Sequence, residues 1–323
     1  MPRNQHQLPE VVIRPEILSF SGHETFVFRY GWMKKAVDAT QGENGNSRIF
    51  TEDNAIADFG VGRNMVRSMR HWSLATGVIE EEVGSRGSAV HPTELGNLIF
   101  GFGGQDQFLE DPNTLWVLHW RIIANPQRCT TWQWAFNSIP SNEFTPDQLM
   151  RLVQEEIGRR NTKVPSNNTL KRDVEVFIRT YTPARTAKGA VVEDSLDCPL
   201  VELQLIEELP DPGVFQIKRG PKSSLSDLVF VYALVDFWDR TSPQQETIAF
   251  TDIAYGKNSP GIAFKLDENS LAERLERLES VTAGDLLYTE TAGLKQVYRK
   301  RSQPKMEYLK AHYDIGAAVA IGA

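Results

Sequence analysis

Residues 51–100 read TEDNAIADFGVGRNMVRSMRHWSLATGVIEEEVGSRGSAVHPTELGNLIF. The stretch predicts a helix, a tight turn, a second helix, a strand, a glycine-rich wing, another strand and a closing helix. This order of elements is typical of a winged helix-turn-helix, in which the second helix enters a DNA groove.

The second predicted helix separates its side chains into two faces when it is wound at roughly 100° per residue. Met65, Met69 and Trp72 gather on one face, with Val66 at its edge. Basic and polar side chains gather on the other face: Arg63, Asn64, Arg67, Arg70 and His71. An apolar face that packs and a basic face that points outward fit a helix that contacts DNA. An ordinary amphipathic surface helix has the same pattern and is the alternative.

The composition sets the wider frame. The 323 residues, 41% hydrophobic and 24% charged, indicate a soluble globular protein long enough for two domains. The formal net charge is −7, so any contact with nucleic acid must come from a local basic face. Cys129 and Cys198 lie far apart without CxxC spacing and predict neither a zinc site nor a disulfide framework. No signal core or membrane-spanning run occurs, so we expect a cytoplasmic protein with no membrane partner.

The segment SGHETFVFRYGWMKKAVDA, residues 21–39, follows a polar arm of residues 1–15. Ser21 and Glu24 match a capping box, which predicts that a helix starts there. His23 beside Glu24 could form a proton-transfer pair. In the alternative interpretation, Glu24 caps the helix while His23 packs or forms a hydrogen bond.

Further basic residues complete the predicted DNA-binding face. Lys34 and Lys35 extend outward from the helix expected after His23, and Arg86 lies in the glycine-rich wing.

Four of the seven tryptophans follow the winged-helix stretch: Trp116, Trp120, Trp132 and Trp134. Exposed aromatic rings could stack on unpaired bases. Trp116 and Trp120, however, share a helical face with Ile123, which indicates a core. The helix that carries them is expected to start at Asp111–Pro112, an acidic N-cap followed by proline.

The next helices are expected over residues 144–160 and 168–181, followed by a long connection over residues 183–213 and a strand over residues 214–218. A helix capped within residues 224–227 runs through Arg240 and is apolar almost all round, so it should be the centre of a second domain.

A second winged-helix pattern comprises a short helix over Ile248–Ala254, a longer one over Asp267–Glu279 and a hairpin. The longer helix is too acidic for a DNA groove, so we interpret this unit as mainly structural or partner-binding. Its hairpin end is basic and could touch phosphates through Lys295, Arg299, Lys300 and Arg301. Residues 315–323 are expected to form a floppy tail.

The expected fold is mainly α with small β wings, an α+β arrangement of two winged helix-turn-helix-like units joined by helical segments. The N-terminal winged-helix domain with its tryptophan-rich extension would span residues 1–140. The C-terminal helical domain would span residues 141–323.

Catalytic motifs are sparse. The sequence contains no P-loop, dinucleotide fingerprint, GxSxG elbow or HExxH. Pro210–Asp211 followed by Gln216-Ile217-Lys218 resembles a PD-(D/E)xK nuclease motif, but the separation is too short and glutamine replaces the usual acid. The residues alone therefore favour DNA binding and supply no convincing catalytic constellation.

Several ordered motifs resemble one bacterial family, the domain-of-unknown-function family numbered four thousand and seven. These are SGHETFVFRYGWMKKAVDA, VGRNMVRSMRHWSLATGVIEE, PTELGNLIFG and EDPNTLWVLHWRIIANPQRCTTWQWAFN, continued by NTLKRDVEVFIRTY, CPLVELQLI, SPGIAFKLDE and TAGLKQVYRK. The similarity runs from about Ile17 to Arg301.

Members of this family occur in operons for DNA phosphorothioation, the replacement of a non-bridging phosphate oxygen by sulfur. The resemblance implies a DNA-nicking component of such a system with a role in anti-phage defence. It also implies a cysteine desulfurase, an ATPase and an ATP pyrophosphatase as partners. His23 and Glu24 gain interest as candidate catalytic residues because they lie in the most recognisable motif.

Cleavage of a phosphodiester usually recruits a divalent metal, so Mg²⁺ or Mn²⁺ is the expected cofactor. A homodimer is left open. The alternative function is a non-enzymatic winged-helix DNA-binding adaptor or transcriptional regulator.

Overall fold

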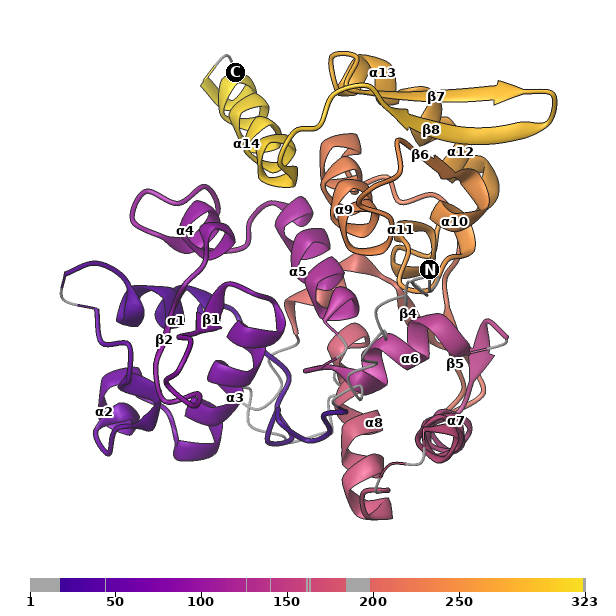
Figure 1. Ribbon diagram of the computed structural model, residues 1–323. Helices are drawn as coiled ribbons and strands as arrows, with labels where there is room; N and C mark the ends of the chain where they lie inside the picture. The colour runs from indigo at the N-terminus through magenta and orange to yellow at the C-terminus, as the bar shows by residue number, and fades with distance from the viewer. Residues whose placement is uncertain are drawn as a thin grey trace, which may run out of the picture.

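The computed structural model describes residues 18–43, 45–125, 127–139, 141–160, 162, 164–183 and 198–321. Helices and three small antiparallel sheets make up this part of the chain (Figure 1). The mixed α and β character of the expected fold is therefore confirmed, whereas the winged helix-turn-helix assignment and the domain boundary after residue 140 stay predictions. The expected polar arm, residues 1–15, lies outside the described residues.

The N-terminal unit has its elements in the order expected from residues 51–100. After a first helix it contains two helices, a two-stranded sheet and a closing helix: α1 (Trp32–Thr40), η1 (Ile49–Thr51), α2 (Ala55–Phe59), α3 (Arg63–Ala75), β1 (Ile79–Glu81), β2 (Val90–Pro92) and α4 (Glu94–Phe100). β1 and β2 pair antiparallel, with Ile79 opposite Pro92. Residues 82–89 form the loop between these strands.

The expected helix start at Ser21 is wrong. Residues 21–25 form a turn, and the first helix begins at Trp32 after Gly31, whose φ is 77°. Glu24 has a φ of 50° and so lies in the left-handed region, where it cannot serve as the third residue of a helix.

The middle of the chain consists of four helices: α5 (Pro112–Ala124), α6 (Thr130–Ser138), α7 (Pro146–Arg159) and α8 (Asn167–Tyr181). The predicted start of α5 is confirmed, because the Asp111 carboxylate accepts a hydrogen bond from the Asn113 backbone N–H at 2.8 Å. Thr145 and Gln148 form a reciprocal capping box at the start of α7.

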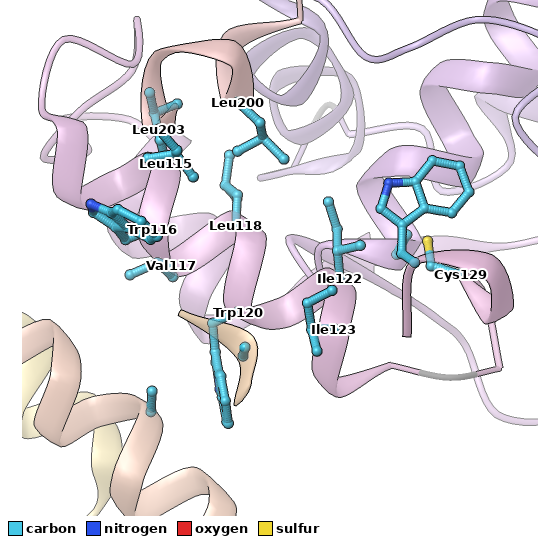
Figure 2. Packing of buried hydrophobic residues seen from close by; sticks show 14 of the residues in the cluster. Leu115, Trp116, Val117, Leu118, Trp120, Ile122, Ile123, Cys129, Leu200 and Leu203 are labelled. Atoms are coloured by element: carbon cyan, nitrogen blue, oxygen red, sulfur yellow. The ribbon is translucent and has the colours of Figure 1, made fainter. Parts of the chain in front are cut away.

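α5 is buried on almost every side. Leu115 and Leu118 lie toward Leu200 and Leu203 of η3 (Pro199–Leu203), as Figure 2 shows. All four tryptophans of this region are at most 1% exposed, so they belong to the core and cannot stack on bases from the surface.

A second sheet has β5 (Phe215–Ile217) between β3 (Glu143–Phe144) and β4 (Ile206–Glu208), all antiparallel. β5 confirms the strand expected near residues 214–218. α7 packs against α8, and α8 in turn contacts β4 of this sheet.

The C-terminal part is built on α9 (Asp227–Thr241), in which residues 229–238 are all buried, as its apolar sequence predicts. Around it lie β6 (Thr247–Ala249), α10 (Phe250–Tyr255), α11 (Pro260–Ala263), α12 (Glu268–Glu276), α13 (Leu278–Val281), β7 (Leu286–Thr291) and β8 (Leu294–Arg299). The third sheet has the order β6-β8-β7.

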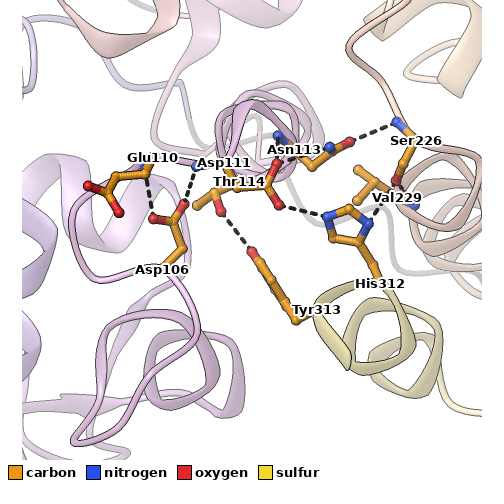
Figure 3. Close-up of polar contacts among 9 residues, drawn as sticks. All are labelled: Asp106, Glu110, Asp111, Asn113, Thr114, Ser226, Val229, His312 and Tyr313. Atoms are coloured by element: carbon orange, nitrogen blue, oxygen red, sulfur yellow. Dashed lines mark hydrogen bonds and ion pairs between the residues drawn. The ribbon is translucent and has the colours of Figure 1, made fainter. Parts of the chain in front are cut away.

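The prediction of a floppy tail over residues 315–323 is wrong. The backbone of most of these residues is helical, because α14 (Lys305–Ile321) continues through them. α14 packs along α9. Its side chains also hold the start of α5: His312 Nε2 lies 2.8 Å from Asp111 Oδ2, and the hydroxyls of Tyr313 and Thr114 lie 2.8 Å apart (Figure 3). The part-buried His312–Asp111 contact and the buried Tyr313–Thr114 contact thus anchor α14 just before residues 315–323. Among the described residues, no helix has both the length and the apolar character needed to span a bilayer.

Candidate nucleic-acid interface

The first two turns of α3 present the predicted basic face to solvent. Arg63, Asn64 and Arg67 are exposed. Arg63 forms no ion pair or hydrogen bond with any described residue. The Arg67 guanidinium lies 3.5 Å from Glu24 Oε1, with 59% and 34% of the two side chains exposed. Such a long, exposed ion pair contributes little to stability, so Arg67 can exchange Glu24 for another anion at small cost.

The opposite face of α3 anchors the helix. Val66, Met69 and Trp72 are buried and Met65 is half-buried, as the helical pattern predicts. The Trp72 indole N–H donates a hydrogen bond to the Phe26 carbonyl at 2.9 Å. This fixed face holds the exposed arginines on a rigid element.

His71 does not point outward as expected. Its side chain is buried, and Gly22 lies so close that a Cβ there would be 2.5 Å from the imidazole Nδ1. Burial, together with the charges of His23, Arg128 and Arg70, lowers the pKa of His71 to about 3. The turn at residues 21–25 covers the second half of α3 on the side of His71. Residues 71–75 are therefore all buried. His71 is therefore neutral at pH 7, and its Nε2 has no hydrogen-bond partner among the described residues.

Arg70 ties α3 to the loop of residues 82–89. Its Nη2 donates to Glu81 Oε1 at 2.8 Å and to the Gly87 carbonyl at 2.7 Å. Arg128 Nη2 lies 3.0 Å from the same carboxylate oxygen. Although burial alone would raise the pKa of Glu81, hydrogen bonds from Arg70 and Arg128 hold it below its ordinary value. Two guanidiniums sharing one carboxylate leave an excess positive charge beside α3.

Arg128 was not among the residues expected from the sequence. It lies between α5 and α6, more than fifty positions after the end of α3 at Ala75, and no local pattern indicates that the chain returns there. The next element, α6, contacts the turn at residues 21–25, where the rings of Trp132 and His23 lie 5.7 Å apart.

The other predicted contacts of the N-terminal unit are more scattered. Arg86 is exposed in the loop of residues 82–89 and has a φ of 55°. Lys34 is paired with Asp38 one helical turn later. Lys35 is exposed and donates a hydrogen bond to the Phe59 carbonyl at 3.2 Å.

His23 is held in a buried hydrogen-bond network. Its Nε2 lies 2.7 Å from Asp173 Oδ1, and its Nδ1 accepts from the Thr25 backbone N–H at 3.1 Å. Asp173 also accepts from the Ser21 N–H at 2.7 Å and from the Thr131 hydroxyl. These bonds place the proton on Nε2 and occupy both ring nitrogens. His23 thus packs and forms hydrogen bonds, as the alternative interpretation expects.

The two candidate catalytic side chains face different partners: His23 faces Asp173, and Glu24 faces Arg67. A direct proton transfer between His23 and Glu24 has no support in this geometry. A catalytic role for either residue stays a prediction.

The basic residues at the second hairpin are all paired with acids. Lys295 lies 3.5 Å from Glu290, Lys300 lies 3.6 Å from Glu279, and Arg299 and Arg301 each lie 2.6 Å from a carboxylate oxygen. These acids reduce the positive potential that the sequence of this hairpin suggests, and its contact with phosphates stays a prediction.

The lysine of the segment that resembles a nuclease motif forms an ion pair with an acid outside that segment. Lys218 Nζ lies 2.5 Å from Glu207 Oε2 across the β4–β5 ladder.

A protein-built site for Mg²⁺ or Mn²⁺ would need oxygen ligands that are free to coordinate. Within the described ranges, no group of three or more His, Cys, Asp or Glu side chains is placed to hold a metal ion. The buried carboxylates already accept hydrogen bonds or pair with cations, as Asp173, Asp236, Asp106 and Asp285 do. The described residues therefore contain no pre-built metal site of this kind, and we assign no chemical step to a metal.

Comparisons with known proteins place this geometry in context. A family model described as "Protein of unknown function (DUF4007)" matches residues 20–313. Two solved structures are similar over nearly the whole chain. The first, described as a magnesium ion-bound SspB crystal structure, has a TM-score of 0.83 and 30% identity over 92% of this chain and 88% of that chain. The second, an SspB crystal structure, has a TM-score of 0.82 and 29% identity over the same shares.

No curated protein matches the sequence. The family match covers most of the chain, and both solved structures share its overall fold. The chain therefore belongs to the DUF4007 family and is an SspB-like protein.

Proposed function

We propose that this protein is a DNA-binding component of a DNA phosphorothioation system, and that it contacts DNA through the first two turns of α3. One observation carries the proposal: Arg63 is an exposed cation without a described partner, on a helix whose other face is fixed in the core. Arg67 and Asn64 extend the same surface. Guanidinium groups pair well with phosphates, and asparagine can pair with an adenine edge.

The charge of the whole protein bears on the expected strength of binding. A net charge of −7 repels a polyanion at long range, so affinity depends on the few cations that reach the backbone. We expect modest affinity without partners and strong dependence on salt. The cysteine desulfurase, ATPase and ATP pyrophosphatase of such a system are the proposed partners.

DNA binding can be tested by fluorescence anisotropy of a labelled duplex at several salt concentrations. Replacing Arg63 and Arg67 by alanine should weaken binding about tenfold or more and reduce the salt slope by about one unit per lost phosphate contact. Arg151→Ala with Arg159→Ala, at two exposed positions on α7, is the control for the loss of two charges. Equal affinity of the variant and the parent protein at every salt concentration would show that this face does not bind DNA.

We further propose that the protein nicks DNA so that sulfur can be incorporated on one strand. This part rests on the family resemblance, since the described side chains contain no group of three or more His, Cys, Asp or Glu that could hold a metal ion. Supercoiled plasmid should give open-circle product when incubated with the protein and Mg²⁺ or Mn²⁺, and EDTA tests the metal requirement. If no open-circle product forms with either metal, with or without the partner proteins, the nicking proposal fails and a DNA-binding adaptor remains.

A further inference from the structure

A groove of about 630 Å³ lies between the turn at residues 21–25 and α8. Thr25 contributes one side, and Arg172 and Arg179 contribute the side formed by α8. Phe215 of β5 and Val176, both buried, contribute apolar surface. The groove therefore combines an apolar floor with a cationic rim.

The two arginines of this rim are available for an anionic ligand. Arg172 and Arg179 are exposed and lie seven residues apart, so they share one face of α8. Neither forms an ion pair or hydrogen bond with another residue that the structure describes. Glu175, the acid between them, also lines the groove and lies 4.0 Å from the ammonium of Lys171, so two guanidiniums there face one carboxylate. The groove consequently carries net positive charge.

The turn at residues 21–25 joins this groove to α3. Thr25 lines the groove, while Glu24 beside it contacts Arg67 of α3. Asp173, the residue after Arg172, accepts hydrogen bonds from Ser21 and His23 and so holds the turn against α8. In Figure 1 the indigo segment that precedes α1 lies between α3 and α8.

A DNA strand would meet both cationic surfaces in succession. Glu24 and Thr25 are adjacent, so their Cα atoms lie about 3.8 Å apart. The contact between Glu24 and Arg67 and the edge of the groove are therefore formed by neighbouring residues of one turn. One strand of a duplex presents a phosphate about every 3.4 Å along the helix axis. A backbone that replaces Glu24 at Arg67 would therefore lie beside Thr25, which lines the groove.

We infer that this groove is a second contact for the backbone of the DNA that α3 binds, with Arg172 and Arg179 pairing with phosphates. The inference rests on the proposed DNA binding by α3. Guanidinium groups bind phosphates in a bidentate way, and here no carboxylate partner has to be displaced.

The test compares three double variants in the duplex-binding assay. Arg172→Ala with Arg179→Ala should lower affinity about tenfold or more and reduce the salt slope by about two units. Arg151→Ala with Arg159→Ala removes the same charge from the neighbouring helix α7 and should change affinity less than about twofold, as surface charges distant from phosphates do. The corresponding lysine variants at 172 and 179 should retain most of the salt slope, because an ammonium also neutralises a phosphate.

The outcomes separate the two proposals. If the α8 variant behaves like the α7 control while Arg63→Ala with Arg67→Ala loses binding, the groove inference is overturned and DNA binding by α3 stands. If neither the α3 nor the α8 variant changes binding, both proposals fail. If the α8 variant keeps its DNA affinity but loses affinity for an acidic peptide such as polyglutamate, the groove serves a protein partner and the inference is overturned. Circular dichroism and thermal melting of each variant exclude misfolding as the cause.

Discussion

The imidazole Nε2 of His23 lies 2.7 Å from Asp173 Oδ1, and this buried contact fastens the turn at residues 21–25 to α8. The same carboxylate accepts hydrogen bonds from the Ser21 backbone and the Thr131 hydroxyl. The turn separates the exposed face of α3 from the groove beside α8. Asp173 therefore fixes the relative position of the two proposed DNA contacts.

We predict that Asp173→Ala destabilises the protein by about 3 kcal/mol or more, because several buried donors would lose their acceptor at a cost of about 1–3 kcal/mol each. Urea denaturation measures the change in the free energy of unfolding. Glu175→Ala, on the exposed side of the same helix, should stay within about 0.5 kcal/mol of the parent protein. A loss at Asp173 no larger than the loss at Glu175 would show that the network does not anchor the turn.

A second substitution at Asp173 distinguishes a structural role of His23 from a catalytic one. Asp173→Asn keeps the shape of the side chain but removes the carboxylate that orients the imidazole. If His23 is structural, nicking should fall only in proportion to the folded fraction. A loss of nicking at full folding would instead support the candidate catalytic role.

A second prediction concerns Glu81, which neutralises part of the charge of Arg70 and Arg128. Glu81→Gln should raise DNA affinity several-fold and steepen the salt dependence, since two guanidiniums beside α3 lose their shared anion. Duplex anisotropy at two salt concentrations measures both effects. Glu82→Gln, an exposed neighbour, provides the same change in net charge. An equal gain from both variants would show that only the net charge matters.

A third prediction concerns His71 and His119, two of the buried histidines. Burial is the main cause that lowers the pKa of His71 to about 3 and that of His119 to about 4, from an ordinary value of 6.5. The unfolded chain takes up these protons from about pH 6.5 downward, whereas the folded protein does not. Stability should therefore fall with decreasing pH between 6.5 and 4, by up to about 1.4 kcal/mol per pH unit for each histidine.

Urea denaturation at pH 7 and pH 5 measures this loss. His71→Leu should reduce the pH dependence, because the unfolded state then has one proton fewer to bind. The exposed His91 provides the control substitution, His91→Gln. If His71→Leu and His91→Gln change the dependence equally, burial of His71 is not its source.

How far the sequence predicts this structure depends on the range of the interactions involved. Helix starts such as Asp111–Pro112 and the buried face of α3 follow from local patterns, and they are confirmed. The orientation of His71 does not follow from a local pattern, because the turn that covers it is formed by residues 21–25, far away in the sequence. Ser21 and Glu24 match a capping box by residue type, but hydrogen bonding to Asp173, 152 positions after Ser21, holds the segment as a turn.

The candidate site shows the same division. Arg63 and Arg67 were predicted because their helix carries its own periodic signal. Arg128, Arg172 and Arg179 were not predicted. Contacts between elements that are distant in the sequence bring each of them to the candidate interface. A sequence pattern can place a charge on a helix face but cannot say which partners neutralise it, as the paired cations of the second hairpin illustrate.

A fourth prediction concerns Lys265, which is buried between the middle and C-terminal parts of the chain. Its ammonium donates to the Phe136 carbonyl at 2.6 Å and lies 5.4 Å from the Phe136 ring, with no carboxylate partner among the described residues. Burial, followed by the charges of Arg219 and Lys222, lowers the pKa of Lys265 from 10.5 to about 7. Above that pH the folded protein releases a proton that the unfolded chain keeps until about pH 10.5. Stability should therefore rise from pH 7 to pH 9, by up to about 2.7 kcal/mol from this group.

Lys265→Met should remove most of that rise while preserving the aliphatic contacts of the side chain. Lys171→Met, at an exposed position on α8, is the matched control for the loss of one ammonium. Free energies of unfolding at pH 7, 8 and 9 give the slope for each protein. Equal slopes for Lys265→Met and the parent protein would mean that Lys265 keeps its proton in the folded state, and that the carbonyl and the ring of Phe136 suffice to hold a buried charge.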